Sequence, residues 1–412
     1  MSIGTRSSRT LRGIPTGIWV LGLVSLLMDV SSEMIHALLP LYLVAVLGAS
    51  ALTVGIIEGI AEATAAITKV FSGALSDRLG KRKLIAATGY GLAAFTKPVF
   101  PLASSVGWLA AARFIDRFGK GIRGAPRDAL VADLAPAHLR GASFGLRQAL
   151  DTVGAFLGPL LAIALMWLTA DSFTFVFWAA VIPAFLAFGL ISLGVEEPER
   201  PAEARAVRAP LSVSGLRRFR SDYWLVVAIA AVFTLARFSE AFLLLKSQSV
   251  GLPITLVPII MVVMNIAYSL SAYPAGILSD RVDRMTVLFI GLLLLVAADL
   301  GLAFSSGVAG VLGGVVLWGL HMGFTQGLLA ALVADTAPPE LRGTAFGILN
   351  LVSGAALLAA SVIAGALWDL TGPAGTFTAG AAFAALAFLG LLAIRGRLSP
   401  VGEAAGRSRI RR

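Results

Sequence analysis

The sequence lacks cysteine and is poor in charged residues. None of its 412 residues is Cys, so disulfides and thiolate metal sites are excluded. Only 14% of the residues are charged, whereas 58% are hydrophobic, and the mean hydropathy is +0.88. This balance differs from that of soluble globular proteins, and the chain is therefore expected to lie mostly in a lipid bilayer.

The motifs of common enzymes are also missing. The sequence has no nucleophile elbow, no HExxH pair, no P-loop and no glycine-rich nucleotide fingerprint at a strand–helix junction. We therefore expect neither enzyme activity nor a cofactor. A polytopic membrane enzyme and a passive channel or scaffold are kept as alternatives from other classes.

Acidic residues are fewer than basic ones, and the formal net charge is +10. The Lys and Arg residues concentrate in the N-terminal tail, alternate loops, a central linker and the C-terminal tail. This distribution follows the positive-inside rule, so both termini of a multi-pass protein of the cell membrane are expected in the cytoplasm. Basic cytoplasmic ends account for the charge, and no nucleic-acid partner is expected.

The chain contains two copies of one unit. Gly73–Lys83 reads GALSDRLGKRK, and Gly276–Arg284 reads GILSDRVDR at a shift of 203 residues. Ala129–Gly145 reads ALVADLAPAHLRGASFG, and Ala331–Gly347 reads ALVADTAPPELRGTAFG at a shift of 202. Two matches at nearly one offset predict an internally duplicated fold.

Apolar segments of about 20 residues, the length that crosses a hydrocarbon core, recur along both copies. The predicted helices span 17–47, 51–71, 84–103, 106–130, 142–168, 173–193, 223–245, 253–276, 285–305, 308–332, 343–367 and 374–394. The predicted organisation is a cytoplasmic tail at 1–16, a six-helix bundle at 17–194, a cytoplasmic linker at 195–221, a second bundle at 222–394 and a basic tail at 395–412.

The pattern G-x-L-S-D-R-x-G-x-R at Gly73–Arg82 resembles the signature of the major facilitator superfamily, between its helices 2 and 3. The resemblance implies an all-α membrane protein that acts as a single chain, with 12 transmembrane helices in two pseudo-symmetric six-helix bundles and alternating access between them. Gly154, Gly158 and Pro159 are similar to the helix-5 motif of proton-coupled export members. The second copy departs from the pattern, because Asp283 stands where Gly80 stands in the first.

Ionisable residues inside membrane helices are costly and are therefore functional candidates. Asp29, Glu33 and His36 share one face of the first predicted helix, and Glu62 lies at a matching depth in the second. Asp29, Glu33 and Glu62 are predicted to carry the coupled proton. The alternatives are that Glu58 and Glu62 pair with cations of neighbouring helices and that His36 packs, shares a proton or binds a metal.

The fourth predicted helix carries a basic stripe, in which Arg113 and Arg117 lie deepest and are predicted to meet an anionic group of a solute. Asp299 is expected to be structural. Arg237 and Glu240 are one turn apart, so an intrahelical pair is the alternative to solute binding. The full set predicted to contact solute is Arg113, Arg117, His36, Arg237, Glu240, His321 and Gln326.

The charged turns are predicted to hold the cytoplasmic side closed. The resemblance assigns this gating role to Asp77 with Arg82 and to Asp280 with Arg281 or Arg284. The arginines of the two R-G turns are expected to brace these turns. The predicted gating residues are Gly73, Asp77, Arg78, Arg82, Arg140, Asp280, Arg281 and Arg342.

Together these features predict a secondary transporter that exports a small anionic or zwitterionic organic solute, such as a metallophore or a drug-like molecule, against entering protons. The expected partners are this solute, protons and the lipid bilayer. Export rather than uptake rests on the helix-5 motif. The alternative within transporters is a divalent metal exporter that uses Asp29, Glu33 and His36 as ligands.

Overall fold

The computed structural model describes residues 13–197, 218–325, 332–333, 336–338 and 341–398, and among these it is helical with no strand. Eight helical segments of this described part are long and apolar enough to cross a membrane. These segments coincide with apolar runs expected from the sequence. Such runs form helices in a membrane, because a helix satisfies its backbone hydrogen bonds within the segment. The chain is thus a multi-helix protein with membrane-spanning character.

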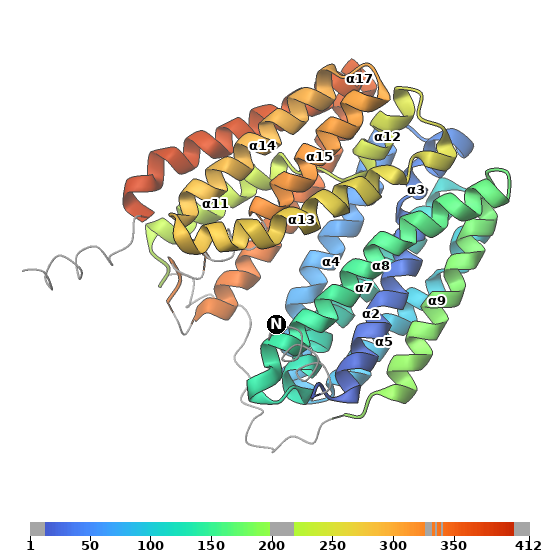
Figure 1. Ribbon diagram of the computed structural model, residues 1–412, viewed down its shortest axis with the longest axis vertical. Coiled ribbons are helices and arrows are strands. Elements are labelled where there is room, and N and C mark those ends of the chain that lie inside the picture. The colour runs from blue at the N-terminus through green and yellow to red at the C-terminus, as the bar shows by residue number, and fades with distance from the viewer. Residues whose placement is uncertain (1–12, 198–217, 326–331, 334–335, 339–340, 399–412) are drawn as a thin grey trace, which may run out of the picture.

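The helices form two groups, which follow the two sequence copies (Figure 1). The N-terminal group, blue to green in Figure 1, consists of α2 (Thr16–His36), α3 (Leu39–Leu41), the π-helical turn η1 (Tyr42–Val46), α4 (Ala51–Leu79), α5 (Arg82–Thr96), α6 (Val99–Leu102), α7 (Val106–Leu134), the 3₁₀ turn η2 (Ala137–Leu139), α8 (Arg140–Leu168) and α9 (Phe173–Gly194).

The C-terminal group, yellow to red in Figure 1, begins after the predicted linker. It consists of α11 (Ser221–Leu235), α12 (Ala241–Ser249), the 3₁₀ turn η4 (Ile254–Leu256), α13 (Ile259–Arg281), α14 (Arg284–Phe304), α15 (Val308–Thr325) and α17 (Arg342–Leu398). The continuous span of α17 contains Gly372 at φ 78°, followed by Pro373, and this non-helical glycine divides it into two helices where the sequence predicts a turn.

Three predicted helices are interrupted. The first stops at His36 and restarts as α3 at Leu39, because Pro40 offers no N–H to the preceding turn. The third divides at Lys97, directly before Pro98. The seventh is broken between Leu235 and Ala241, so the prediction of one helix over 223–245 is wrong there.

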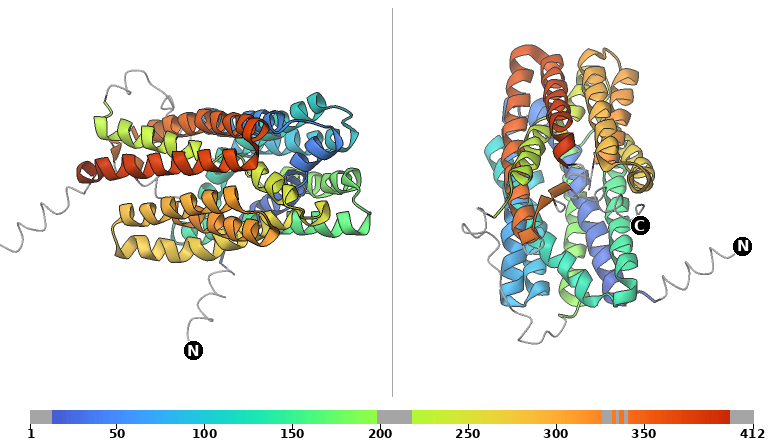
Figure 2. Two further views of the ribbon diagram at one scale, coloured as in Figure 1. Left: turned by 90° about the horizontal axis from the view of Figure 1, so that it is seen from above. Right: turned by 90° about the vertical axis from the view of Figure 1, so that its left-hand side faces the viewer.

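The two groups meet along α4 and α17, which lie side by side in Figures 1 and 2. Glycines allow this contact: a Cβ on Gly55 would lie 2.1 Å from the Ser361 carbonyl oxygen, and a Cβ on Gly365 would lie 2.6 Å from the Ala51 carbonyl oxygen. Gly59 likewise faces the backbone of α17. The contact is therefore backbone against backbone over the first part of α4.

We name the two ends of the molecule by their turns. The far end holds the turns at Gly48 and Gly372, and the linker end holds the turn at Gly80. The two groups converge at the far end and diverge toward the linker end (Figure 1). At the far end the Asp369 carboxylate of the C-terminal group accepts hydrogen bonds from the backbone N–H groups of Ala51 (3.1 Å) and Leu52 (3.0 Å), the first residues of α4.

Candidate functional site

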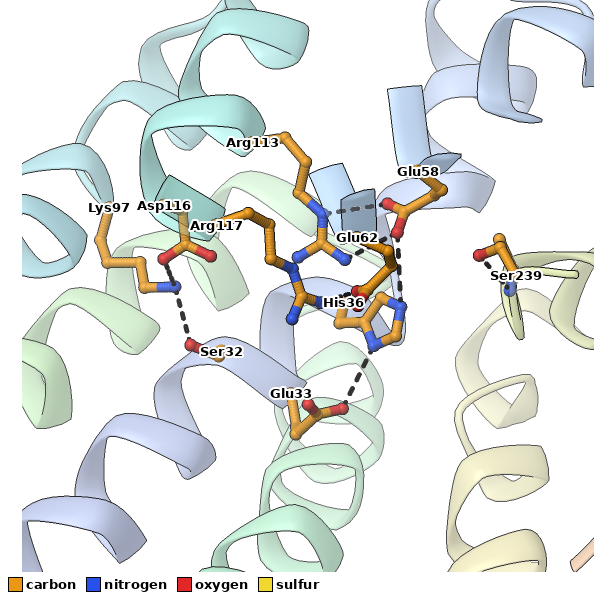
Figure 3. Close-up of polar contacts among 11 residues, drawn as sticks. Ser32, Glu33, His36, Glu58, Glu62, Lys97, Arg113, Asp116, Arg117 and Ser239 are labelled. Carbon is orange, nitrogen blue, oxygen red and sulfur yellow. Dashed lines mark hydrogen bonds and ion pairs between the residues drawn. The ribbon is translucent and has the colours of Figure 1, made fainter. Parts of the chain in front are cut away.

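A network of buried charges lies on the inner side of the N-terminal group, where α2, α4 and α7 meet (Figure 3). Its centre is a two-pronged ion pair in which Arg113 donates to both oxygens of Glu58, over 3.1 Å and 2.7 Å. The side chains of both residues are at most 1% exposed. Arg113 is thus neutralised by Glu58 and buried in this conformation, and its contact with a solute stays a prediction.

His36 extends this network from α4 to α2. Its Nε2 lies 3.7 Å from Glu58 Oε2, and its Nδ1 lies 3.3 Å from Glu33 Oε2. Both ring nitrogens therefore face carboxylates, as Figure 3 shows. Among the described residues no three or more His, Asp or Glu side chains are arranged to hold a metal ion, so the geometry does not favour a metal site built from Asp29, Glu33 and His36.

Further members of the stripe on α7 also have partners. Arg117 lies 3.0 Å from Glu62, and Asp116 accepts a hydrogen bond of 2.9 Å from Lys97, which also donates to Ser32 over 3.1 Å. The sequence-based alternative, in which Glu58 and Glu62 pair with cations of the fourth helix, is the arrangement found here. Glu62 and Arg117 are consequently weaker candidates for carrying a proton or binding a solute.

Asp29 stands apart from these pairs and faces a second carboxyl group. Asp29 packs against α8 one turn beyond Asp151, since a Cβ on Gly154 would lie 3.0 Å from the Asp29 Cβ, and Asp151 is its acidic neighbour there. Asp151 is held from its other side by Arg127 at 3.6 Å and Arg147 at 3.5 Å. Two neighbouring carboxylates repel one another, and a proton on one of them removes this repulsion. Asp151 was not among the residues predicted to carry the proton.

The helix-5 glycines allow α8 to approach the two acids of α2. A Cβ on Gly154 would lie 3.0 Å from the Cβ of Asp29, and a Cβ on Gly158 would lie 2.7 Å from the Cβ of Glu33. Pro159 follows within the same helix. The motif therefore sets the spacing of the helices that carry Asp29 and Asp151, and this is the close packing expected of a small-xxx-small pattern.

Lys120 is a cation that the sequence-based site omitted. It lies in the middle of α7 on the same face as Arg113 and Arg117. Its side chain is exposed, and it forms no hydrogen bond or ion pair with any described residue. Asp29, Glu33 and Glu62 are its nearest acids. The available signal was its position in the stripe, one turn beyond Arg117.

In the C-terminal group, Arg237 and Glu240 lie in the break between α11 and α12 rather than on one continuous helix. Within the described part of the chain they form no ion pair; Arg237 lies over the Phe233 ring at 5.7 Å. Glu240 faces His36 and Glu33 of the N-terminal group. Both side chains are partly exposed, as a solute contact requires.

Two predicted solute contacts of the C-terminal half remain, His321 and Gln326. His321 is fully buried, with Nδ1 2.9 Å from the Gly291 carbonyl oxygen. Its ring lies 5.5 Å from that of Phe233, so in this conformation it packs inside the C-terminal group, and its contact with a solute stays a prediction. Gln326 lies outside the described residues.

The charged turn at the linker end is organised around Arg82. Its guanidinium contacts Asp77 at 2.8 Å and Asp133 at 2.6 Å and also donates to the Ala129 carbonyl oxygen. Gly80 ends α4 at φ 66°, the left-handed conformation that glycine adopts most readily. The expected Asp77–Arg82 contact is thus present, and its partners all belong to the N-terminal group.

The structure shows fewer contacts for the other predicted gating residues. Gly73 lets α4 approach α7, since a Cβ there would lie 3.2 Å from the Cβ of Ala125. Three arginines are exposed, namely Arg78, Arg140 and Arg342. The side chains of Asp280 and Arg281 lie outside the described residues.

The duplicated helical groups and their charged turns agree with comparisons to known proteins. The model of the Major Facilitator Superfamily matches residues 21–245 and 241–410. The chain belongs to the major facilitator superfamily. It is accordingly a multi-pass membrane protein and a transporter of small molecules rather than an enzyme.

Relatives support this membership over nearly the whole chain. An uncharacterized MFS-type transporter of Methanocaldococcus jannaschii is 33% identical over 93% of this chain and 96% of its own length. The multidrug resistance protein MdtH of Photorhabdus laumondii subsp. laumondii is 27% identical over 81% of this chain and 82% of its own. The crystal structure of the nucleoside transporter NupG shares the fold, with a TM-score of 0.75 at 14% identity over 92% of this chain and 99% of that one.

Proposed function

We propose that this protein is a proton-coupled exporter of small zwitterionic or anionic organic solutes in the cell membrane. In this proposal twelve transmembrane helices form two six-helix bundles, and a site between them opens alternately to either side. The observation that carries the proposal is the pair of carboxyl groups, Asp29 and Asp151, beside the unpaired Lys120. The likeness to MdtH supports export.

The carboxyl pair supplies the chemistry of coupling. Two carboxyl groups in contact cannot both ionise without strong repulsion, so they hold one proton between them. A cationic group of a solute that enters between Asp29 and Asp151 removes this repulsion and displaces the proton. The proton and the solute then compete for the same carboxyl pair. Such competition is what the exchange of a proton for a solute requires.

The surrounding cations and the opposite group define the solute. Lys120 offers a charge to an anionic group next to the carboxyl pair, and Arg237 offers a second one from the C-terminal group. Glu240 faces the same space. A solute with one positive and one negative group satisfies both sets of charges. A purely anionic solute would contact Lys120 and Arg237 alone and would not compete with the proton.

The test is proton flux in proteoliposomes that contain the purified protein and an internal pH-sensitive dye. The probes are a zwitterionic quinolone, benzoate and tetraphenylphosphonium, added to the wild type, Asp29→Asn and Asp151→Asn. We expect the zwitterion to evoke proton movement in the wild type and in neither variant. The matched control is Asp222→Asn, which removes an acid from the first turn of α11, away from this site. Wild-type flux that persists with unchanged pH dependence in Asp29→Asn would refute the assignment.

A further inference from the structure

Asp299 on α14 is a buried acid that the proposed site does not use. Its side chain is 0% exposed, and neither carboxyl oxygen has a hydrogen-bond partner within the described ranges. A Cβ on Gly380 of α17 would lie 2.7 Å from Asp299 Oδ2 and 2.9 Å from Phe238 Cε1. The carboxyl group and the Phe238 ring therefore converge on the same point of the second segment of α17.

Among the residues that the structure describes, no charged group forms an ion pair with Asp299. His321 on α15 contacts the Gly291 carbonyl oxygen instead, and Lys246 on α12 donates to the Ser305 carbonyl oxygen. Arg237, Glu240, Tyr268 on α13 and Asp369 on the first segment of α17 are further ionisable groups of the neighbouring elements, and none of them forms a hydrogen bond or ion pair with Asp299.

The N-terminal group also holds a buried ionisable residue at the corresponding position, but that residue has a counter-ion. Its fully buried Lys97, at nearly the same position in the sequence copy, is neutralised by Asp116 and bonded to Ser32. An unpaired charge in an apolar interior costs several kcal/mol, so an acid without such partners holds its proton.

The element that covers Asp299 is also the irregular segment of the seventh helix. Phe238 lies between Arg237 and Ser239 in the break between α11 and α12. The Ser239 N–H donates to Ser361 Oγ of α17 over 3.2 Å, which anchors the break in this position. One residue before Phe238, Arg237 forms no ion pair with any described residue. The ring that lies against the buried acid and the cation without an ion pair are thus adjacent residues of one irregular segment.

We propose that Asp299 is a second proton-binding residue of the transport cycle and that Arg237 becomes its partner when the proton leaves. The O–H bond of the carboxyl group breaks, the proton passes to water, and the carboxylate keeps the electron pair and faces the guanidinium. The segment 236–240 shifts to allow this contact. Arg237 then leaves the solute space, so loss of the proton weakens the hold on an anionic group. This inference rests on the proposed proton-coupled export.

The first experiment measures protons moved per solute in proteoliposomes, from the solute gradient that just balances a known pH gradient. The probe is the zwitterionic quinolone. We expect Asp299→Asn to retain solute exchange between equal pH values but to move about half as many protons per solute as the wild type. Asp222→Asn, which changes an acid at the linker end of α11, is expected to keep the wild-type ratio. An Asp299→Asn ratio and pH profile equal to those of the wild type would overturn the inference.

A second measurement decides the role of Asp299 even if the variant transports nothing. Infrared difference spectra between two pH values detect the C=O stretch of a protonated carboxyl group. We expect one such band in the wild type that is lost in Asp299→Asn and shifted in Arg237→Gln. A spectrum of Asp299→Asn identical to that of the wild type would contradict the proposal. A wild type that moves no protons at all would refute the proposed function, and the infrared band would still test Asp299.

Discussion

Replacing Asp369 with Ala is expected to open the far end of the molecule. This carboxylate crosses from the C-terminal group to the first two N–H groups of α4, at Ala51 and Leu52. These N–H groups have no partner within the helix, and a carboxylate at this position also interacts favourably with the helix dipole. The Ser50 side chain still accepts from the Thr53 N–H in the variant, so α4 keeps its own cap.

The size of the effect follows from these contacts. Loss of a helix cap costs about 0.5–2 kcal/mol, and loss of a favourable charge at a helix terminus costs about 0.3–1 kcal/mol. Because the contact joins the two groups, its loss affects only the conformation that is closed at the far end. The closed-to-open equilibrium should therefore shift by about 1–3 kcal/mol, which is roughly 5- to 150-fold.

The absence of cysteine makes the assay direct, since no native thiol competes for the label. Ser104 and Ser306 are exposed far-end turn residues, one on each group, and both can be changed to Cys and spin-labelled. Double electron–electron resonance should show a larger long-distance population in Asp369→Ala than in the parent pair. Asp222→Ala, which removes an acid from a helix N-terminus inside one group, should leave the distances unchanged. Equal distance distributions with and without Asp369 would refute the reasoning.

Two further predictions concern stability, measured by thermal unfolding in detergent. Gly158→Ala should destabilise the protein by about 1–3 kcal/mol, because the new methyl group would meet Glu33 on α2; Gly301→Ala, where a Cβ meets open space, is the control, and an equal loss there would contradict the packing argument. Glu58→Gln should cost up to about 3–5 kcal/mol because it leaves Arg113 as a buried charge without its counter-ion. The double variant with Arg113→Met should recover part of that loss, and no recovery would argue against an unpaired charge as its cause.

Most of the fold could be predicted from the sequence, because hydropathy and an internal repeat are written into it. The breaks near Pro40, at Lys97–Pro98 and at Gly372–Pro373 coincide with residues that disfavour a helix. The break at 236–240 has no such local signal. It is held by contacts such as the Ser239 N–H with Ser361, 122 residues away, which a local reading of the sequence does not include.

The candidate site could be predicted only in part. Asp29 and the helices that carry the charges followed from the cost of ionisable residues in a membrane. Which acid pairs with which cation could not be predicted, because the pairing depends on how two helices are rotated against one another. Five charged residues of the α7 stripe acquire ion-pair partners, namely Arg113, Asp116, Arg117, Arg127 and Asp128, and Lys120 does not. The sequence shows equivalent stripe positions for all of them, and only the packing distinguishes the cation that stays available.

The glycine contact between α4 and α17 has a consequence for how the molecule moves. At Gly55, Gly59 and Gly365 the surfaces that touch are largely main chain, so few side chains there must change rotamer when one helix rolls over the other. This line of contact can therefore serve as a hinge, about which the two groups tilt without the separation of interlocked side chains. A methyl group at Gly55 would meet the Ser361 carbonyl oxygen of α17. We expect it to restrict the tilt of the two groups about this hinge.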